Sequence, residues 1–170
     1  MLAVEAKVKL DIGSGEFRYQ DYTTVDLFDP HADVAADMGD LPFPDDSVSD
    51  IWASHVLEHQ KPDLVQSTLR EWLRVLEPGG VARIMTPDLD YACRAWLERK
   101  PGAQSMIFGM YEGHGQVHYL GWGAVELRDE LQAAGFEVLT CQGIRESIYS
   151  NLGGTYWHDM VNIYAEARKR

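Results

Sequence analysis

Residues with ligand-binding side chains follow short apolar runs in the first third of the chain, where loops would leave predicted strands. The first run ends in a glycine-rich turn with an acid just before it: Asp11, Gly13, Ser14 and Gly15. Because glycine has no Cβ, a ligand can approach the backbone of such a turn closely. The second run ends near Asp26 and Leu27, where a carboxylate can accept hydrogen bonds from both hydroxyls of a ribose.

Two further pairs of residues continue this series. Asp37 and Met38 follow a weaker run, and they could bind an adenine amino group and pack on the ring, respectively. Ser54 and His55 stand where the next run ends. Each feature alone has an ordinary alternative, a tight turn for the glycines and a solvated acid at a strand end for the aspartates. Their joint appearance in this order favours a ligand that contains a nucleoside.

The elements that must position these groups alternate between strands and helices. Apolar runs predict strands at 8–12, 23–27, 32–36, 50–53, 81–86, 136–141 and 160–167. Spacing and end signals predict helices at 62–76, 89–97 and 124–134. This alternation predicts one α/β domain over residues 1–170, with ligands at the carboxyl ends of parallel strands. Residues 101–123 have no clear period and are interpreted as an inserted segment.

Five stretches of the sequence resemble the class I S-adenosylmethionine-dependent methyltransferases: VKLDIGSG, TTVDLFDP, ADMGDLPFPDDSVSDIWASHVLEH, LREWLRVLEPGGVARIMTPDL and LQAAGFEV. They cover most of residues 8–88 and a patch at 131–138. The resemblance implies a Rossmann-like, mostly parallel seven-stranded sheet with an antiparallel last strand. It also implies an enzyme with S-adenosyl-L-methionine as cofactor and S-adenosyl-L-homocysteine as product. The chain looks like a compact bacterial subgroup of this family, often met near sugar and cell-surface polymer biosynthesis.

The resemblance also assigns roles to the residues above. Asp11 and the turn Gly13-Ser14-Gly15 would face the methionine portion of the cofactor. Asp26 would hold the ribose hydroxyls, with Leu27 beside it. Asp37 and Met38 would frame the adenine, and Ser54 and His55 would line the floor beneath the sulfonium. Residues 101–123 would form the acceptor pocket or a cover.

The sequence departs from the family pattern in its short connections. Only residues 16–22 separate the glycine turn from the second predicted strand, and only 28–31 precede the third. A parallel crossover normally needs about a dozen residues or more. Phe17 also replaces the third glycine of the family turn. We therefore expect abbreviated N-terminal helices and a sheet face that needs cover from the inserted segment, a C-terminal element or a second copy, and we predict a homodimer.

Histidine is the side chain best suited to removing a proton from an acceptor near neutral pH. His114 and His118 lie in the inserted segment, and the resemblance singles out His118. His55 and His59 have an i,i+4 spacing found among metal ligands, but the HExxH pattern is missing, so no metal is predicted. His59 and its neighbour Glu58 are interpreted as a cap or a loop anchor.

Composition limits the partners of the protein. A net charge of −12 argues against binding to a nucleic-acid backbone, which depends on lysine and arginine. No apolar run is long enough for a membrane span, and the absence of a signal-peptide pattern leaves a cytoplasmic location as the expectation. We expect O- or N-methylation of a small-molecule or glycan-type acceptor. Two alternatives stay open: a cofactor-binding module without catalysis and a nicotinamide-dependent enzyme, against which LPFPDD and EPGG speak.

Overall fold

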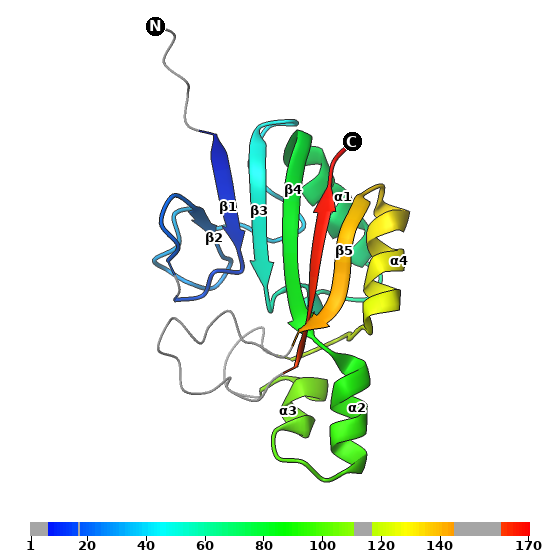
Figure 1. Cartoon of the computed structure of the whole chain (residues 1–170). Coiled ribbons are helices and arrows are strands. Elements are labelled where there is room, and N and C mark those ends of the chain that lie inside the picture. Colours follow the sequence, from blue (N-terminus) through cyan, green and yellow to red (C-terminus); the bar gives the residue numbers. More distant parts are fainter. Residues whose placement is uncertain (1–6, 17, 111–116, 145–160) are drawn as a thin grey trace, which may run out of the picture.

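The computed structural model describes residues 7–16, 18–110, 117–144 and 161–170 of the chain. Its centre is a six-stranded sheet in the order β2-β1-β3-β4-β6-β5 (Figure 1). The strands are β1 (Val8–Ile12), β2 (Thr23–Val25), β3 (Val48–Ser54), β4 (Leu76–Pro87), β5 (Glu137–Ile144) and β6 (Asn162–Arg168). Strand β6 is antiparallel to both of its neighbours, and the other pairs are parallel. The Rossmann-like sheet with an antiparallel last strand is therefore confirmed.

The predicted number of seven strands is wrong, because the weak run at 32–36 forms a single bridge. Only Val34 pairs with Val25 there. The backbone N–H of Thr24 donates to the Asp33 carboxylate at 2.9 Å, and its hydroxyl donates to the same oxygen at 2.8 Å. A side-chain carboxylate thus takes the acceptor place of a strand carbonyl, and the ladder ends after one bridge.

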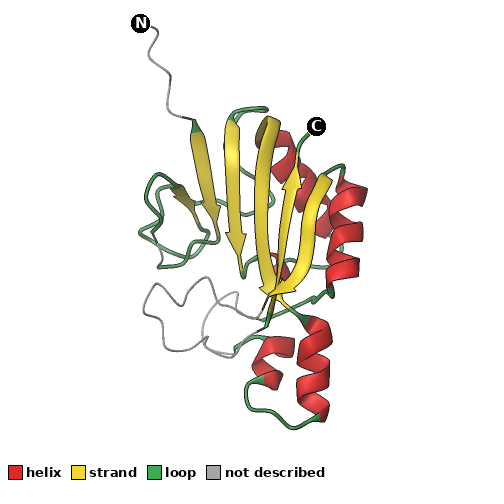
Figure 2. Ribbon diagram, in the orientation of Figure 1, coloured by secondary structure: helices red, strands yellow, loops and turns green. Residues whose placement is uncertain are grey.

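Helices α1 (Val65–Val75) and α4 (Ala124–Ala134) lie on one face of the sheet (Figure 2). Helices α2 (Leu89–Leu97) and α3 (Ala103–Phe108) lie beyond the carboxyl ends of the parallel strands, and a short 3₁₀ helix, η1 (Leu57–His59), follows β3. Two of the predicted end signals are confirmed, whereas Pro62 does not begin a helix, since α1 starts at Val65. The Asp88 carboxylate caps α2 by accepting from the Tyr91 N–H at 2.9 Å, and Gly135 ends α4 in the left-handed conformation.

The strand register separates the sheet into an apolar and a charged face. Leu10, Ile51 and Ala82 are partners across β1, β3 and β4, and all three are fully buried under α1 and α4. One residue further along each strand, Asp11, Trp52 and Arg83 are partners on the opposite face. Since side chains alternate along a strand, the first set forms the core and the second set points away from it.

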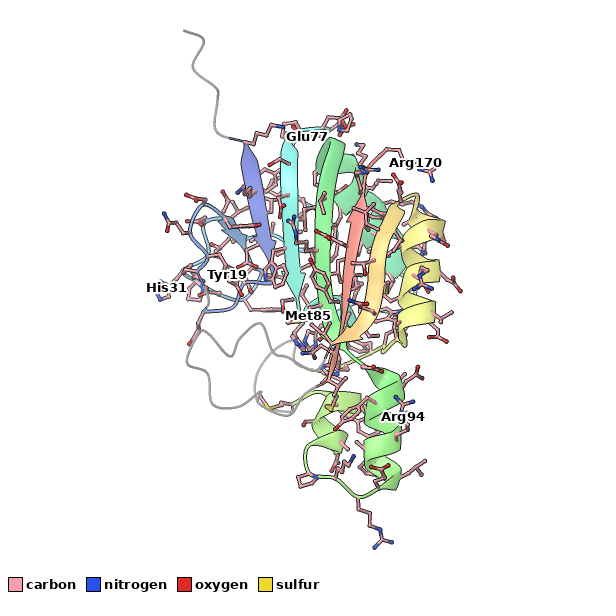
Figure 3. All side chains as sticks on the ribbon, viewed as in Figure 1. Tyr19, His31, Glu77, Met85, Arg94 and Arg170 are labelled. Atoms are coloured by element: carbon pink, nitrogen blue, oxygen red, sulfur yellow. The ribbon has the colours of Figure 1, made fainter. Side chains whose placement is uncertain are left out.

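No helix among the described residues covers the charged face, as the short connections predicted. Its polar groups bind each other instead. Arg83 pairs with Asp50 and lies 3.1 Å from Glu166, and the Tyr22 hydroxyl donates to Asp50 at 2.8 Å. The ring of Tyr19, which Figure 3 labels beside the β1–β2 loop, packs edge-on to Trp52 at 6.1 Å. The described part of this face is therefore charged and aromatic, and it presents little apolar area that demands cover.

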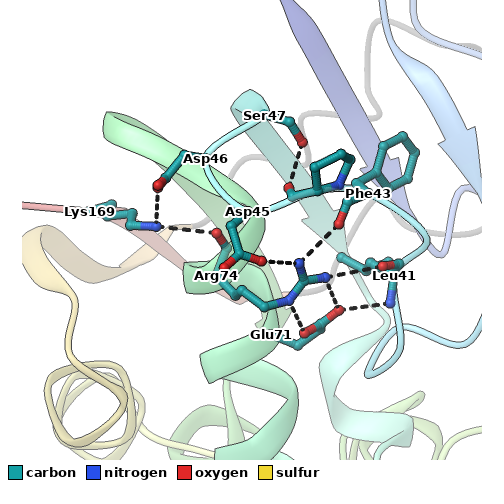
Figure 4. A network of polar contacts seen from close by, with 9 residues as sticks. Leu41, Phe43, Asp45, Asp46, Ser47, Glu71, Arg74 and Lys169 are labelled. Carbon is teal, nitrogen blue, oxygen red and sulfur yellow. Dashed lines mark hydrogen bonds and ion pairs between the residues drawn. The ribbon is translucent and has the colours of Figure 1, made fainter.

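A network around Arg74 fixes the loop before β3 to helix α1 (Figure 4). The Arg74 guanidinium donates to the carbonyl oxygens of Leu41 and Phe43 and pairs with Asp45 and Glu71. Glu71 in turn accepts from the Leu41 N–H at 2.9 Å. The LPFPDD stretch is thus held by an ion-pair network against the first core helix. None of the described helices has the length and apolar character to span a membrane.

Candidate functional site

A cavity of about 1420 Å³ opens at the carboxyl ends of the parallel strands. Loops after β1, β2 and β3 line one side, and residues of α2, α3 and the 117–119 segment line the other. Ligand pockets are commonly about 300–1,000 Å³, so this cavity is larger than most. Its location agrees with the general rule for open parallel sheets.

The glycine turn after β1 has the backbone that its sequence requires. Gly13 has a φ of +69°, and a Cβ there would lie 2.4 Å from Cγ2 of Val56. The Gly13 N–H donates to the Val25 carbonyl at 2.8 Å, which ties the turn to β2. Both Gly13 and Gly15 line the cavity. Only glycine fits at position 13, so the fold itself requires a turn whose backbone a ligand can approach closely.

Asp26 holds the neighbouring loops together at the same end. Its Oδ2 accepts from the Gly15 N–H at 3.0 Å, and its Oδ1 accepts from the N–H groups of Phe28 and Asp29 at 2.8 and 2.9 Å. A carboxylate offers about four acceptor positions, so about one is left for a ribose hydroxyl. Binding of both ribose hydroxyls would require exchange of one of these backbone bonds. Leu27 lines the cavity beside Asp26.

Asp37 and Met38 also line the cavity, next to the glycine end. The Asp37 Oδ1 accepts from the Gly39 N–H at 2.8 Å, and the Met38 carbonyl accepts from Nε1 of the buried Trp72 at 2.8 Å. The core helix α1 therefore positions this loop. The second carboxylate oxygen of Asp37 and the thioether of Met38 are left to meet a ligand.

Three of the predicted residues stand behind the cavity wall. Asp11, Ser14 and Ser54 are only 2%, 5% and 7% exposed, and none of them lines the cavity. The Asp11 Oδ2 and the Ser14 Oγ are buried and have no hydrogen-bond partner. Burial raises the pKa of the Asp11 carboxyl from 3.8 to about 7, with Asp26 adding to this rise and Arg18 opposing it. Such unsatisfied polar atoms beside a glycine turn fit the polar methionine portion of a nucleoside cofactor.

His55, at the end of β3, lines the cavity and has a φ of +53°, which is uncommon for a residue other than glycine. Its Nδ1 lies 3.2 Å from Oε1 of Glu58, a carboxylate that is fully buried. Burial opposes ionisation of Glu58, but the imidazoles of His55 and His59 lower its pKa on balance. A buried acid therefore lies behind the histidines that line this part of the cavity.

His118 also lines the cavity, with its ring 5.0 Å from the His59 ring. The Nδ1 of His118 is 3.0 Å from the Met106 carbonyl, and the Nδ1 of His59 is 3.0 Å from the Val117 carbonyl. His59 is thus a loop anchor, as predicted. Burial lowers the pKa of His118, so its ring is neutral at pH 7. His114 lies outside the described residues.

Some lining residues were not predicted from the sequence. Tyr91, Lys100 and Met106 come from α2, α3 and their connection, and they close the cavity opposite the glycine turn. Helix α3 lies in the segment without a clear hydrophobic period, so the sequence pattern did not predict it. The burial of Glu58 was also missed, because its neighbours in the sequence give no sign that a loop 60 residues later covers it.

Comparisons with known proteins agree with this geometry. Residues 10–84 match the family model described as "Methyltransferase domain". No curated protein matches the sequence. Among solved structures, a Methanosarcina mazei S-adenosylmethionine-dependent methyltransferase is similar, with a TM-score of 0.67 at 15% identity, over 95% of this chain and 91% of that one.

Two further structures share the fold. A Burkholderia thailandensis 1,6-didemethyltoxoflavin-N1-methyltransferase with bound S-adenosylhomocysteine has a TM-score of 0.63 at 22% identity, over 95% of this chain and 70% of that one. The complex of the Haloferax volcanii Trm112 methyltransferase activator with a methyltransferase has a TM-score of 0.62 at 17% identity, over 99% of this chain and 84% of that one. At these identities the structures show a shared fold.

The fold is that of the Rossmann-like methyltransferases, and the family match spans the segment that carries the glycine turn and the acids. Taken together, the family match over residues 10–84 and the shared fold support a class I S-adenosylmethionine-dependent methyltransferase, an enzyme with that cofactor.

Proposed function

We propose that this enzyme methylates an oxygen or nitrogen of a small-molecule or glycan-type acceptor. One observation carries the proposal: the glycine turn, two aspartates and the His118 imidazole all line a single cavity. The cavity volume supports simultaneous binding of cofactor and acceptor, which an in-line group transfer requires. Residues 101–123 supply much of the acceptor side in this proposal.

The glycine end would hold the cofactor. Gly13 would admit it to the backbone, Asp26 would accept from the ribose, and Asp37 with Met38 would meet the adenine. Asp11 and Ser14 lie behind the wall at this point, so they would act on the methionine portion through the glycine turn, without direct contact. When bound, S-adenosylmethionine supplies a methyl group on a positively charged sulfur, which a nucleophilic acceptor atom can attack.

The histidine end would act on the acceptor. An acceptor hydroxyl must lose its proton as it becomes a nucleophile, and a neutral imidazole can take that proton. His118 is neutral at pH 7, and the bond of its Nδ1 to the Met106 carbonyl leaves Nε2 for the acceptor. His114, in the same segment, is the second candidate for this role.

Calorimetry and turnover together test the proposal. We expect the wild-type protein to bind S-adenosylhomocysteine. We also expect it to convert S-adenosylmethionine to S-adenosylhomocysteine when it is incubated with a panel of phenols, amines and sugar derivatives. Binding of the cofactor without methylation of any acceptor would favour a cofactor-binding module over a methyltransferase that acts on these acceptors. Absence of binding would contradict both. The predicted homodimer is tested separately by light scattering, where a mass of 19.2 kDa would contradict it.

A further inference from the structure

The Glu58 carboxylate is buried behind the cavity-lining residues His55 and His59, and His55 is its ion-pair neighbour. It is 0% exposed, and neither Oε1 nor Oε2 accepts a hydrogen bond. His55 Nδ1 lies at an ion-pair distance of 3.2 Å from Oε1, and the imidazoles of His55 and His59 favour the ionised carboxylate. An unsatisfied buried carboxylate costs several kcal/mol unless it is paired or coordinates a metal. One histidine at ion-pair distance leaves further acceptor positions of this carboxylate for a ligand.

The two neighbouring imidazoles are oriented by the backbone. His59 and His118 each use Nδ1 on a carbonyl oxygen, of Val117 and Met106 respectively. A histidine that donates from Nδ1 to a carbonyl has its tautomer fixed, with the lone pair on Nε2. This is the usual second-shell arrangement of metal-ligating histidines. Both rings also line the cavity, so their Nε2 atoms are within reach of a ligand that enters there.

The three groups are close enough for one ion. Ligand atoms of Glu58, His59 and His118 all lie within 4.8 Å of one another, and no other such group of three occurs among the described residues. In a tetrahedral zinc site, ligand atoms about 2.0–2.2 Å from the ion lie about 3.3–3.6 Å apart. Side-chain rotations that draw the three atoms about 1 Å closer together would therefore complete the site.

We propose that Glu58, His59 and His118 bind a first-row divalent cation such as Zn²⁺, with open coordination positions that face the acceptor end of the cavity. Two imidazoles and one carboxylate suit such ions, and three protein ligands leave room for a water or a substrate oxygen. The proposal replaces the earlier prediction of no metal, which rested on the absence of HExxH. The third ligand, His118, comes from the 117–119 segment, and its distance along the sequence from His59 does not predict a shared site.

The role of this cation rests on the proposed function. An acceptor hydroxyl bound to the cation has a lower pKa, so its O–H bond breaks more readily, the proton passes to water and the oxygen keeps the electron pair. The acceptor class is then a small molecule with a hydroxyl that can reach the cation. His118 acts in this account as a ligand, and direct proton transfer to its Nε2 is the competing account.

Cobalt(II) titration of chelator-treated protein tests the site without any acceptor. We expect one equivalent of Co²⁺ per chain, visible absorption typical of low-coordinate cobalt, and displacement by Zn²⁺. Glu58→Gln and His118→Ala should each weaken binding at least 100-fold. His31→Ala is the matched control, because His31 is exposed on the outer loop beyond β2 (Figure 3), and it should bind like wild type.

Circular dichroism and S-adenosylhomocysteine calorimetry on each variant separate loss of the site from loss of the fold. If Glu58→Gln does not fold, His118→Ala and His59→Ala carry the test. Folded wild type that binds no Co²⁺, or variants that bind it unchanged, would overturn the proposal. Methyl transfer that survives chelation would show that His118 acts directly. Failure of S-adenosylhomocysteine binding would overturn the proposed function and leave the cobalt result to stand separately.

Discussion

The two ends of the cavity are built in different ways. The glycine end comes from consecutive loops within residues 11–38, tied together by bonds such as that between the Gly15 N–H and Asp26. The histidine end joins η1 to a segment 58 residues further along the chain, through the bond from His59 to the Val117 carbonyl. Local turn chemistry is therefore enough to form the cofactor side, whereas the acceptor side depends on tertiary packing.

The largest expected effect lies at the glycine end. Gly13→Ala places a Cβ 2.4 Å from Val56 and forces a side chain into a φ of +69°. We expect affinity for S-adenosylhomocysteine to fall at least 100-fold, with a lower melting temperature, because the turn must move. Calorimetry and thermal unfolding measure these changes.

Gly79→Ala is the control for backbone strain. Its φ is +84°, and no heavy atom lies within 4 Å of its Cβ position, so only the strain of about 1–2 kcal/mol applies. Unchanged cofactor affinity is expected. Equal losses of affinity in both variants would contradict a specific role for the Gly13 turn.

The next effect separates the two ends. His118→Ala should lower kcat/KM about 10²- to 10⁴-fold, because a group that activates the acceptor is lost. The Kd for S-adenosylhomocysteine should change by less than about twofold, since His118 lies at the acceptor end and is held by the Met106 carbonyl. Steady-state kinetics and calorimetry on the same preparation measure both. A loss of cofactor affinity as large as the loss of rate would contradict a separate acceptor role for His118.

The smallest effect is the pH dependence of the cofactor end. Asp11 has a pKa raised by burial to about 7, so it becomes ionised between pH 6 and pH 8. We expect S-adenosylmethionine affinity to rise severalfold over this interval, because the ionised carboxylate attracts the positive groups of the cofactor. Asp11→Asn should show a flat profile in calorimetry. A pH dependence that persists in this variant would assign the titration to another group.

The same substitution has an opposite effect on stability. A carboxyl whose folded pKa exceeds its unfolded value stabilises the fold at low pH, and this contribution is lost as pH rises from about 4 to 7. Ligand-free Asp11→Asn should therefore be more stable than wild type at pH 8, by up to about 4 kcal/mol. Urea unfolding at pH 5 and pH 8 measures the difference, and a less stable variant at pH 8 would contradict it.

Much of the fold was predictable because its signals are local. Helix α4 has the predicted bounds, since the Gly135 stop is a matter of turn chemistry. Strand β4 begins at Leu76, five residues before the predicted start at 81, because Leu76 already pairs with Val48, ahead of a register shift that leads to the Asp50–Val81 pair. Helix α3 and the failed third strand depend on packing and on the Asp33 side chain, and neither can be deduced from periodicity.

The candidate site divides in the same way. Asp26, Asp37 and Met38 line the cavity, because each directly follows a strand or its bridge at one sheet edge. Asp11 and Ser14 were expected to face the ligand, but the strand and turn geometry places them behind the wall as buried, unsatisfied groups. The meeting of Glu58 with His118 depends on the 117–119 segment returning over η1, which sequence spacing does not encode.

A crystal structure of the protein grown with S-adenosylhomocysteine tests the central claim most directly. We predict density for the nucleoside between Asp26 and Met38, with the sulfur directed toward the histidine end and the space beside His118 left for an acceptor. Density for the nucleoside at the His118 end, or binding outside this cavity, would contradict the division into a cofactor end and an acceptor end.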